Sequence, residues 1–183
     1  MDDDAELYML ARRGEREALA ALIERHKDGL VRYLTRVAGG HEHAEDVAQE
    51  AFLRLAEGRG DYRPELGAFR SYLYRIATNL VISRQRRRRR WQRLLPRLHA
   101  SNGHHLEAPQ ERAVERAELR ARLLSALAEV PVVYRSSLVL HHLEGWSYAD
   151  IAAALDCSVG TVKSRIFRAR RHLQQTLGPQ RPT

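Results

Sequence analysis

The sequence predicts an all-α protein made of two small helical domains joined by a flexible linker. Apolar residues recur three and four positions apart along nearly the whole chain, and no stretch shows sustained alternation with β-branched enrichment. Prolines, histidines and a Ser-Asn-Gly turn gather between 91 and 110, a composition typical of a linker. We therefore expect an N-terminal domain over 1–90, a linker over 91–110 and a C-terminal domain over 111–177.

The periodic stretches place helices over about 3–13, 16–37, 42–57, 68–88, 111–129, 132–142, 147–155 and 159–176. Glycines at 14, 39–40, 58, 145 and 178 separate most of them.

Charge is unevenly distributed. The formal net charge is +8, and the segment from Leu66 to Leu106 contains arginines but no Asp or Glu. A second acid-free segment runs from Cys157 to the C-terminus and is also basic. Two basic zones indicate two phosphate-contacting surfaces, because phosphate neutralisation dominates affinity for nucleic acids. A solvated surface with an arginine-rich linker explains the same charges.

Several function classes find no support. A single cysteine, Cys157, makes neither an internal disulfide nor a cysteine-rich zinc site, and the histidines lack zinc-site spacing. We therefore expect no metal and no cofactor, and the chain contains no motif of an enzyme. No apolar run approaches the roughly 18 residues that span a bilayer, and the N-terminus is acidic. We expect a cytoplasmic protein without membrane insertion.

Residues 145–173 predict a helix-turn-helix in the C-terminal domain. Ser147 and Ser158 are placed to cap two successive helices, a turn at 156–157 separates these helices, and Gly160 is a small residue where the helices would cross closely. On a helical wheel, the inner face of the second helix consists of Val162, Ile166, Ala169 and Leu173. The outer face consists of Ser164, Phe167, Arg168 and Arg171, flanked by Lys163 and Arg165.

An outward aromatic among cations favours a DNA major groove. Phe167 could pack on a thymine methyl or a sugar, while Arg168 reads guanine. A basic solvated face with Phe167 packed against a neighbouring helix is the alternative. The run YRSSLVLHHLEGWSYADIAAALDCSVGTVKSRIFRARRHL resembles region four of extracytoplasmic-function (ECF) sigma factors, in which this helix enters the minus-thirty-five promoter element. The resemblance implies base or groove contacts by Lys163, Ser164, Phe167 and Arg168, and backbone contacts by Ser158, Thr161 and Arg171.

Upstream, HAEDVAQEAFLRL presents an acidic and amide stripe opposite a face of Val47, Ala51 and Leu55. The stripe consists of Asp46, Gln49, Glu50, Leu53 and Glu57, and it suggests docking to a basic protein partner. Asp46 and Glu50 could formally be a pair of catalytic carboxylates, but they lie on an exposed helix face that implies no cleft. The segment resembles region two of the same family, which binds the clamp helices of the polymerase's largest subunit. The resemblance carries that role to Asp46, Gln49, Glu50 and Phe52.

The next segment, DYRPELGAFRSYLYRIATNLVISRQRR, resembles the family's elements that melt and recognise the minus-ten element. On a helical wheel, the buried face of this segment consists of Phe69, Leu73, Ile76 and Leu80. The outer sides carry Ser71, Arg75, Thr78, Asn79 and Ile82. In the family, the loop corresponding to 61–68 captures a flipped base. Capture requires stacking and hydrogen bonding. The candidates for contacts with the downstream element are Tyr62, Tyr72, Arg75 and Asn79.

The resemblance thus implies a sigma factor that directs promoter-specific transcription initiation and is not itself an enzyme. Its expected partners are core RNA polymerase, through the clamp helices and the flap, promoter DNA, and an anti-sigma factor. The five arginines at 86–90 are expected in the connector, near nucleic acid. The alternatives are an autonomous helix-turn-helix regulator, an RNA-binding protein and a metal-dependent enzyme.

Overall fold

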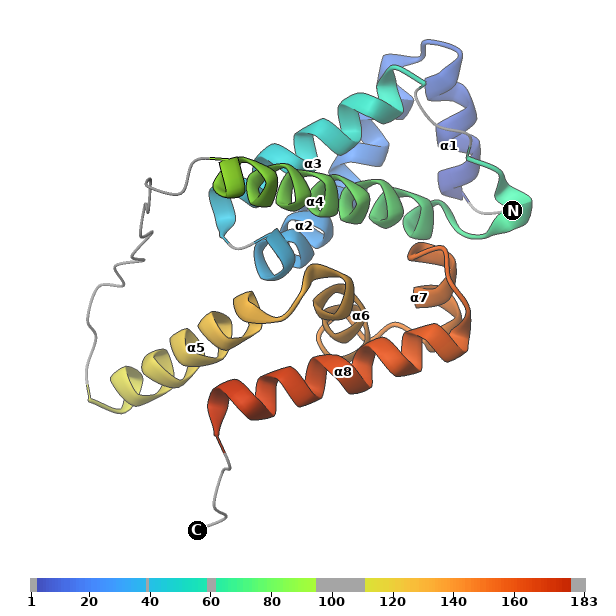
Figure 1. The fold of residues 1–183 in the computed structure, drawn as a ribbon. Helices are drawn as coiled ribbons and strands as arrows, with labels where there is room; N and C mark the ends of the chain where they lie inside the picture. The colour runs from blue at the N-terminus through green and yellow to red at the C-terminus, as the bar shows by residue number, and fades with distance from the viewer. Residues whose placement is uncertain (1–2, 39, 59–61, 95–110, 179–183) are drawn as a thin grey trace.

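The computed structural model describes residues 3–38, 40–58, 62–94 and 111–178, and the regular elements in those ranges are all helical. The first group of helices comprises α1 (Asp3–Arg12), α2 (Arg16–Ala38), α3 (His41–Ala56), the short 3₁₀ helix η1 (Pro64–Leu66) and α4 (Phe69–Leu94). The second group comprises α5 (Glu111–Glu129), α6 (Val132–His142), α7 (Tyr148–Ala154) and α8 (Val159–Leu177). The two groups lie against each other in Figure 1. The all-α prediction is confirmed.

Helix α4 is longer than the sequence predicted. It continues to Leu94, so the arginines at 86–90 are helical and not part of an irregular connector. Arginine is a good helix former, and successive side chains point about 100° apart, so the five charges are distributed around the helix. The remainder of the expected linker, 95–110, lies outside the described residues.

The first group packs α2, α3 and α4 around a common core. Leu34, Ala51 and Leu73 have no exposed surface, and Val47 is 1% exposed. The inner face predicted for the segment that forms α3 is therefore confirmed. Helix α1 is fastened to α2 by the nearly buried Asp4, whose carboxylate pairs with Arg25 and, at 2.8 Å, with His26 Nε2.

The second group contains a buried arginine that caps a helix. Arg135 Nε donates to the Val130 carbonyl oxygen at 3.2 Å, and its Nη2 donates to the Ala128 carbonyl oxygen at 3.0 Å. Burial lowers the pKa of Arg135 to about 10, so the guanidinium remains charged at neutral pH. A cation at the C-terminal carbonyls of α5 is favourable in the field of the helix dipole. Arg135 thereby fixes the end of α5 to α6.

Helices α7 and α8 form the predicted helix-turn-helix. Ser147 Oγ accepts a hydrogen bond from the Asp150 amide at 3.1 Å, and Ser158 Oγ accepts one from the Thr161 amide at 3.1 Å. Both predicted caps are confirmed. Asp156, with a φ of 48°, turns the chain between the helices. The expected crowding at Gly160 is wrong, because a Cβ there would meet only Ser158 Oγ, at 3.8 Å.

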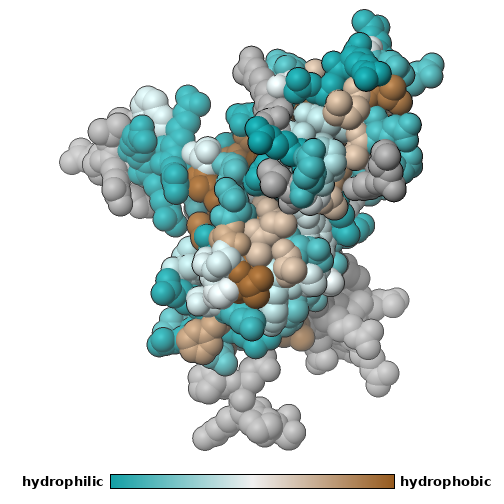
Figure 2. Space-filling view, turned by 90° about the vertical axis from the view of Figure 1, so that its right-hand side faces the viewer, coloured by the Kyte–Doolittle hydropathy of each residue, from teal (hydrophilic) through white to brown (hydrophobic). Residues whose placement is uncertain are grey.

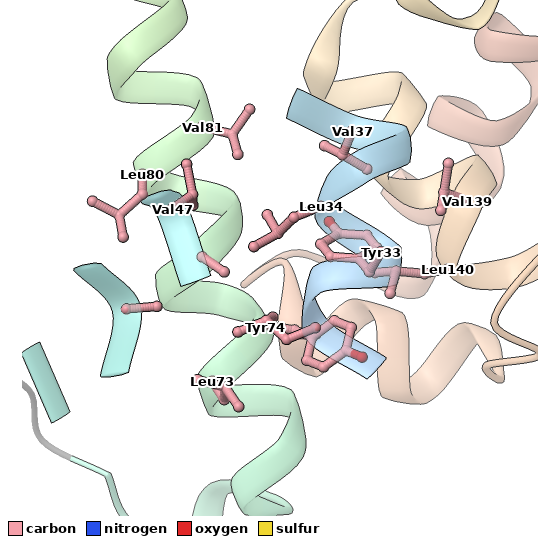
Figure 3. Packing of buried hydrophobic residues seen from close by; sticks show 14 of the residues in the cluster. Tyr33, Leu34, Val37, Val47, Leu73, Tyr74, Leu80, Val81, Val139 and Leu140 are labelled. Atoms are coloured by element: carbon pink, nitrogen blue, oxygen red, sulfur yellow. The ribbon is translucent and has the colours of Figure 1, made fainter. Parts of the chain in front are cut away.

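A junction between the two groups, absent from the sequence predictions, is formed mainly by α2 and α4 on one side and by α6, α7 and the loop between them on the other. Tyr33 and Tyr74 of the first group belong to the same buried apolar cluster as Val139 and Leu140 of α6 (Figure 3), and all four are 0–1% exposed. The Trp146 ring lies 4.9 Å from the Tyr74 ring.

Charged groups complete the junction. The Glu144 side chain is only 4% exposed, and its carboxylate pairs with Arg36 and, at 4.0 Å, with Arg32 Nε, both on α2. On α4, the Arg70 guanidinium lies over the Trp146 ring, 4.4 Å from its centroid. A buried carboxylate is tolerated when it is paired in this way.

The junction explains why two residues of α4 are buried although the helical wheel placed them on the outer sides. Ser71 and Thr78, expected on outer sides, are 8% and 2% exposed. Thr78 Oγ1 lies 2.8 Å from Tyr33 Oη and donates to the Tyr74 carbonyl oxygen at 2.7 Å. Burial raises the pKa of Tyr33 to about 12, so the phenol stays neutral and can take part in this bond. Helix α4 is covered on more than one side, whereas the prediction from the helical wheel assumed a single buried face.

Replacing Trp146 by alanine should loosen the junction while both groups stay helical. The lost packing of a buried tryptophan is worth roughly 3–5 kcal/mol, and here much of it crosses between the groups. Small-angle X-ray scattering should give a larger radius of gyration at unchanged helical circular dichroism. Trp91→Ala is the matched control, since that ring is 55% exposed. An unchanged radius for Trp146→Ala would contradict this view of the junction.

Replacing Ser158 by alanine should lower the free energy of unfolding by about 1 kcal/mol, because the Thr161 amide loses its side-chain acceptor. Urea unfolding in the absence of DNA measures this change. Ser125→Ala, at an exposed position within α5, removes a serine that caps no helix and should have little effect. Equal effects of the two substitutions would show that the cap contributes nothing to stability.

Candidate functional site

The outer face of α8 carries the most exposed large apolar residue in the described part of the chain. Phe167 is 62% exposed, whereas Val162, Ile166 and Ala169, on the inner face, are 0–4% exposed. The other predicted outer residues, Lys163, Ser164, Arg168 and Arg171, are all exposed. The inner and outer faces predicted for α8 are therefore confirmed. The alternative, in which Phe167 packs against a neighbouring helix, is wrong.

Three cations of α8 lie against aromatic rings of α6 or the start of α7. Arg168 Nη1 donates to Tyr134 Oη at 3.1 Å, and Lys163 Nζ lies 5.8 Å from the centroid of the Tyr148 ring. Arg170 Nη2 and His142 Nε2 are 2.9 Å apart. Burial lowers the pKa of His142, which favours the neutral ring that can accept this bond. Local sequence patterns do not indicate these three contacts, because they join separate helices.

The first turn of α8 has the features of a phosphate site. Ser158 is exposed and caps the helix, and its Oγ lies 2.9 Å from Thr161 Oγ1. The first amides of a helix and its dipole favour a negatively charged group. Figure 2 views the side of the molecule where α8 begins, and its surface is mostly hydrophilic with small separate apolar patches. This face is chemically suited to a polar, anionic partner.

The α3 stripe is largely exposed. Asp46 and Gln49 are exposed, and Leu53 is 57% exposed. Phe52, which the resemblance also implicated, is buried at 7% exposure.

Glu50 differs from the expected free surface acid. Its side chain is half-buried, and its carboxylate accepts hydrogen bonds from Arg84 Nη2 at 2.7 Å and from Arg54 Nη2 at 2.8 Å. Arg84 first, and Arg54 next, hold the pKa of Glu50 below its ordinary value. Glu50 is therefore ionised at neutral pH, but its charge is already paired within the protein.

The candidate residues for the downstream element divide into buried rings and surface groups. Tyr62 and Tyr72, each 7% exposed, have ring centroids 5.3 Å apart, and Tyr8 of α1 lies 5.2 Å from Tyr62. By contrast, Asn79 is exposed, and the half-buried Arg75 lies over the Tyr72 ring at 5.3 Å. Tyr8 was not predicted to lie here, since nothing local in the sequence indicates that α1 returns to cover the rings.

No cluster of three His, Cys, Asp or Glu residues suited to a metal occurs among the residues that the structure describes. The half-buried Cys157 accepts a hydrogen bond at Sγ from Arg165 Nη1, at 3.4 Å. Within the same described ranges, no helix has the length and apolar character needed to cross a membrane.

Comparison with known proteins identifies both halves of the chain. Sigma-70 region 2 matches residues 22–91, and Sigma-70 region 4 matches residues 120–173. The RNA polymerase sigma-H factor of Pseudomonas aeruginosa is 34% identical, over 97% of this chain and 95% of its own length. The ECF RNA polymerase sigma-E factor of Haemophilus influenzae is 32% identical over 96% of each chain.

Solved structures agree. CnrH in complex with the cytosolic domain of CnrY has a TM-score of 0.64 and 29% identity, covering 95% of this chain and 96% of that one. The sigma factor RpoE in complex with the anti-sigma factor NepR from Bartonella quintana shares the fold, with a TM-score of 0.65 at 23% identity over 87% of this chain and 96% of that one. The chain thus belongs to the ECF sigma factors of the sigma-70 family, non-enzymatic subunits that serve RNA polymerase in transcription initiation.

Proposed function

We propose that this sigma factor recognises its promoters through three separate surfaces once it is bound to core polymerase. The α3 stripe docks on the polymerase, the outer face of α8 reads the minus-thirty-five element, and the Arg75–Asn79 side of α4 contacts the minus-ten element. The exposure of Phe167 among cations is the observation that carries the proposal. A ring that is 62% exposed and set among cations is suited to pack on a thymine methyl or a sugar of DNA while the cations meet phosphates and base edges.

The upstream surface divides into reading and positioning contacts. Lys163, Ser164, Phe167 and Arg168 face the groove and contact bases. Ser158, Thr161 and Arg171 contact the DNA backbone. Ser158 caps the first turn of α8, and the backbone amides at the start of a helix favour an anion such as a phosphate group. This supports the assignment of the backbone contacts.

The polymerase surface consists of Asp46, Gln49, Glu50 and Leu53, and it docks on the clamp helices of the largest subunit. Its chemistry suits a basic surface with an apolar pocket for Leu53. Because Glu50 is already paired with Arg84 and Arg54, the exposed Asp46 supplies most of the attraction.

The domain over 111–177 contacts the polymerase flap, and the domain over 1–90 contacts the clamp. The segment 91–110 connects them. This division follows the two matched family regions, which leave 92–119 outside both.

The downstream surface is built from Asn79 and Arg75, which reach solvent, and it rests on Tyr62 and Tyr72. At 7% exposure, the two tyrosines offer a flipped base little surface in this conformation. Stacking of a base on them requires the Tyr8 end of α1 to move aside.

An anti-sigma factor is the further partner that we propose. The solved relatives RpoE and CnrH are each in complex with another protein, the anti-sigma factor NepR and the cytosolic domain of CnrY.

The alternative of an autonomous helix-turn-helix regulator is wrong, because the chain belongs to the sigma factors of RNA polymerase. It would use the same α8 face and bind its operator without polymerase. The exposed Leu53 on the acidic face of α3 favours the holoenzyme, because DNA binding gives that face no role.

Asp46→Lys combined with Leu53→Asp should reduce the affinity for core polymerase at least about tenfold, because one change reverses the attraction and the other removes the apolar contact. A competition assay with labelled sigma factor measures this affinity. Glu15→Lys, at another exposed acid, controls for the added charge. Retention of full affinity by the double variant would refute docking through α3.

Arg168→Ala should cost about 1–3 kcal/mol at one upstream base and flatten the preference there, because it removes a two-bond contact with guanine. Arg171→Ala should instead weaken all promoters similarly and lower the slope of log affinity against log salt by about one. Transcription from a promoter library randomised over the upstream element, with holoenzymes containing each variant, distinguishes the two. Identical profiles would show that the assignment of reading and backbone roles is wrong.

A further inference from the structure

We propose that Tyr134 is the residue that positions Arg168 for base reading, so that a side chain of α6 sets specificity in the groove occupied by α8. This inference rests on the proposed role of Arg168. Tyr134 lies outside the helix-turn-helix formed by α7 and α8, and it was not among the residues that the sequence singled out.

Two contacts join the pair. Arg168 Nη1 donates a hydrogen bond to Tyr134 Oη at 3.1 Å, and the Arg168 Cζ atom lies 5.7 Å from the centroid of the Tyr134 ring. The ring is itself held, because it stacks on His172 of α8 with centroids 6.0 Å apart and planes inclined by 28°. Tyr134 is half-buried between α6 and α8, whereas Arg168 is exposed. A fixed tyrosine therefore restrains a flexible arginine.

The restraint leaves the arginine able to read a base. A guanidinium has five N–H donors, and the bond to Tyr134 uses one on Nη1. The Nε and Nη2 donors remain, and they form the parallel pair that matches O6 and N7 of guanine. An unrestrained arginine loses much of its side-chain conformational entropy when it is fixed on a base. Because Tyr134 limits those conformations before DNA binds, less entropy is lost on binding.

The other cations of α8 have different partners. Lys163 has only a ring contact, with Tyr148, and Arg170 pairs with His142. Among these three cation–aromatic contacts, only the Arg168–Tyr134 pair has both a hydrogen bond to a tyrosine hydroxyl and a ring contact. Removing the hydroxyl of Tyr134, and separately that of Tyr148, therefore tests whether the hydrogen bond to the guanidinium matters or only the closeness of a ring to a cation.

The test measures base preference with holoenzyme and a promoter library randomised over the upstream element. Tyr134→Phe should reduce discrimination at the base read by Arg168 roughly fivefold, the equivalent of one hydrogen bond, and leave the other positions unchanged. In the Arg168→Ala background the same substitution should have no further effect, because its target is gone. Tyr148→Phe is the matched control and should not change the preference at that base. Thermal unfolding and holoenzyme assembly of each variant verify folding.

The outcomes are separable. If Arg168→Ala flattens the preference and Tyr134→Phe does not, positioning by Tyr134 is refuted and the reading role of Arg168 stands. If Tyr134→Phe still lowers discrimination when Arg168 is absent, Tyr134 acts on DNA by itself and the inference is wrong. If Arg168→Ala leaves the preference unchanged, the proposed reading role fails and the inference fails with it.

Discussion

The arrangement of this molecule depends on burying two tyrosines, Tyr33 and Tyr74, between helices of both groups. Tyr74 reaches this position because α2 has a glycine at the contact, Gly29, where a Cβ would lie 3.3 Å from the phenol oxygen. Burying these rings brings Trp146 against Tyr74 and encloses the Glu144 carboxylate. Such a mixed apolar and ionic contact is specific in geometry, because the carboxylate must meet its arginines to be tolerated away from water. The positions of α6 and α7, and through them that of α8, follow from it.

The charged surfaces of the protein are organised by internal pairing. On α8, cations rest against aromatic side chains of neighbouring helices, and on α3 the Glu50 carboxylate is held by Arg84 and Arg54. A charge that is already paired contributes less to a new interface, since the internal bond is exchanged for an external one. The exposed apolar residues Phe167 and Leu53 therefore support the two proposed binding surfaces better than net charge does.

The sequence predicted what depends on local periodicity and missed what depends on contacts between distant segments. Helix positions, the caps at Ser147 and Ser158, and the exposure of Phe167 follow from spacing along one helix, and the structure confirms them. The burial of Thr78 and the pairing of Glu50 with Arg84 require knowing which second element lies across from each residue. Five consecutive arginines suggested an irregular connector, yet helix propensity prevailed and α4 continued through them.

The junction also has a geometric consequence for the promoter. A globular chain of this length has a radius of gyration of about 16 Å and therefore a diameter of roughly 40 Å. The minus-ten and minus-thirty-five elements lie about 25 base pairs apart, which is roughly 85 Å of duplex at about 3.4 Å per base pair. On the proposal that one molecule contacts both elements at once, the two groups must separate at the junction, which parts Trp146 from Tyr74 and Glu144 from its arginines. On that proposal, the free energy lost at the junction opposes assembly of the holoenzyme, and substitutions that weaken the junction lower this cost.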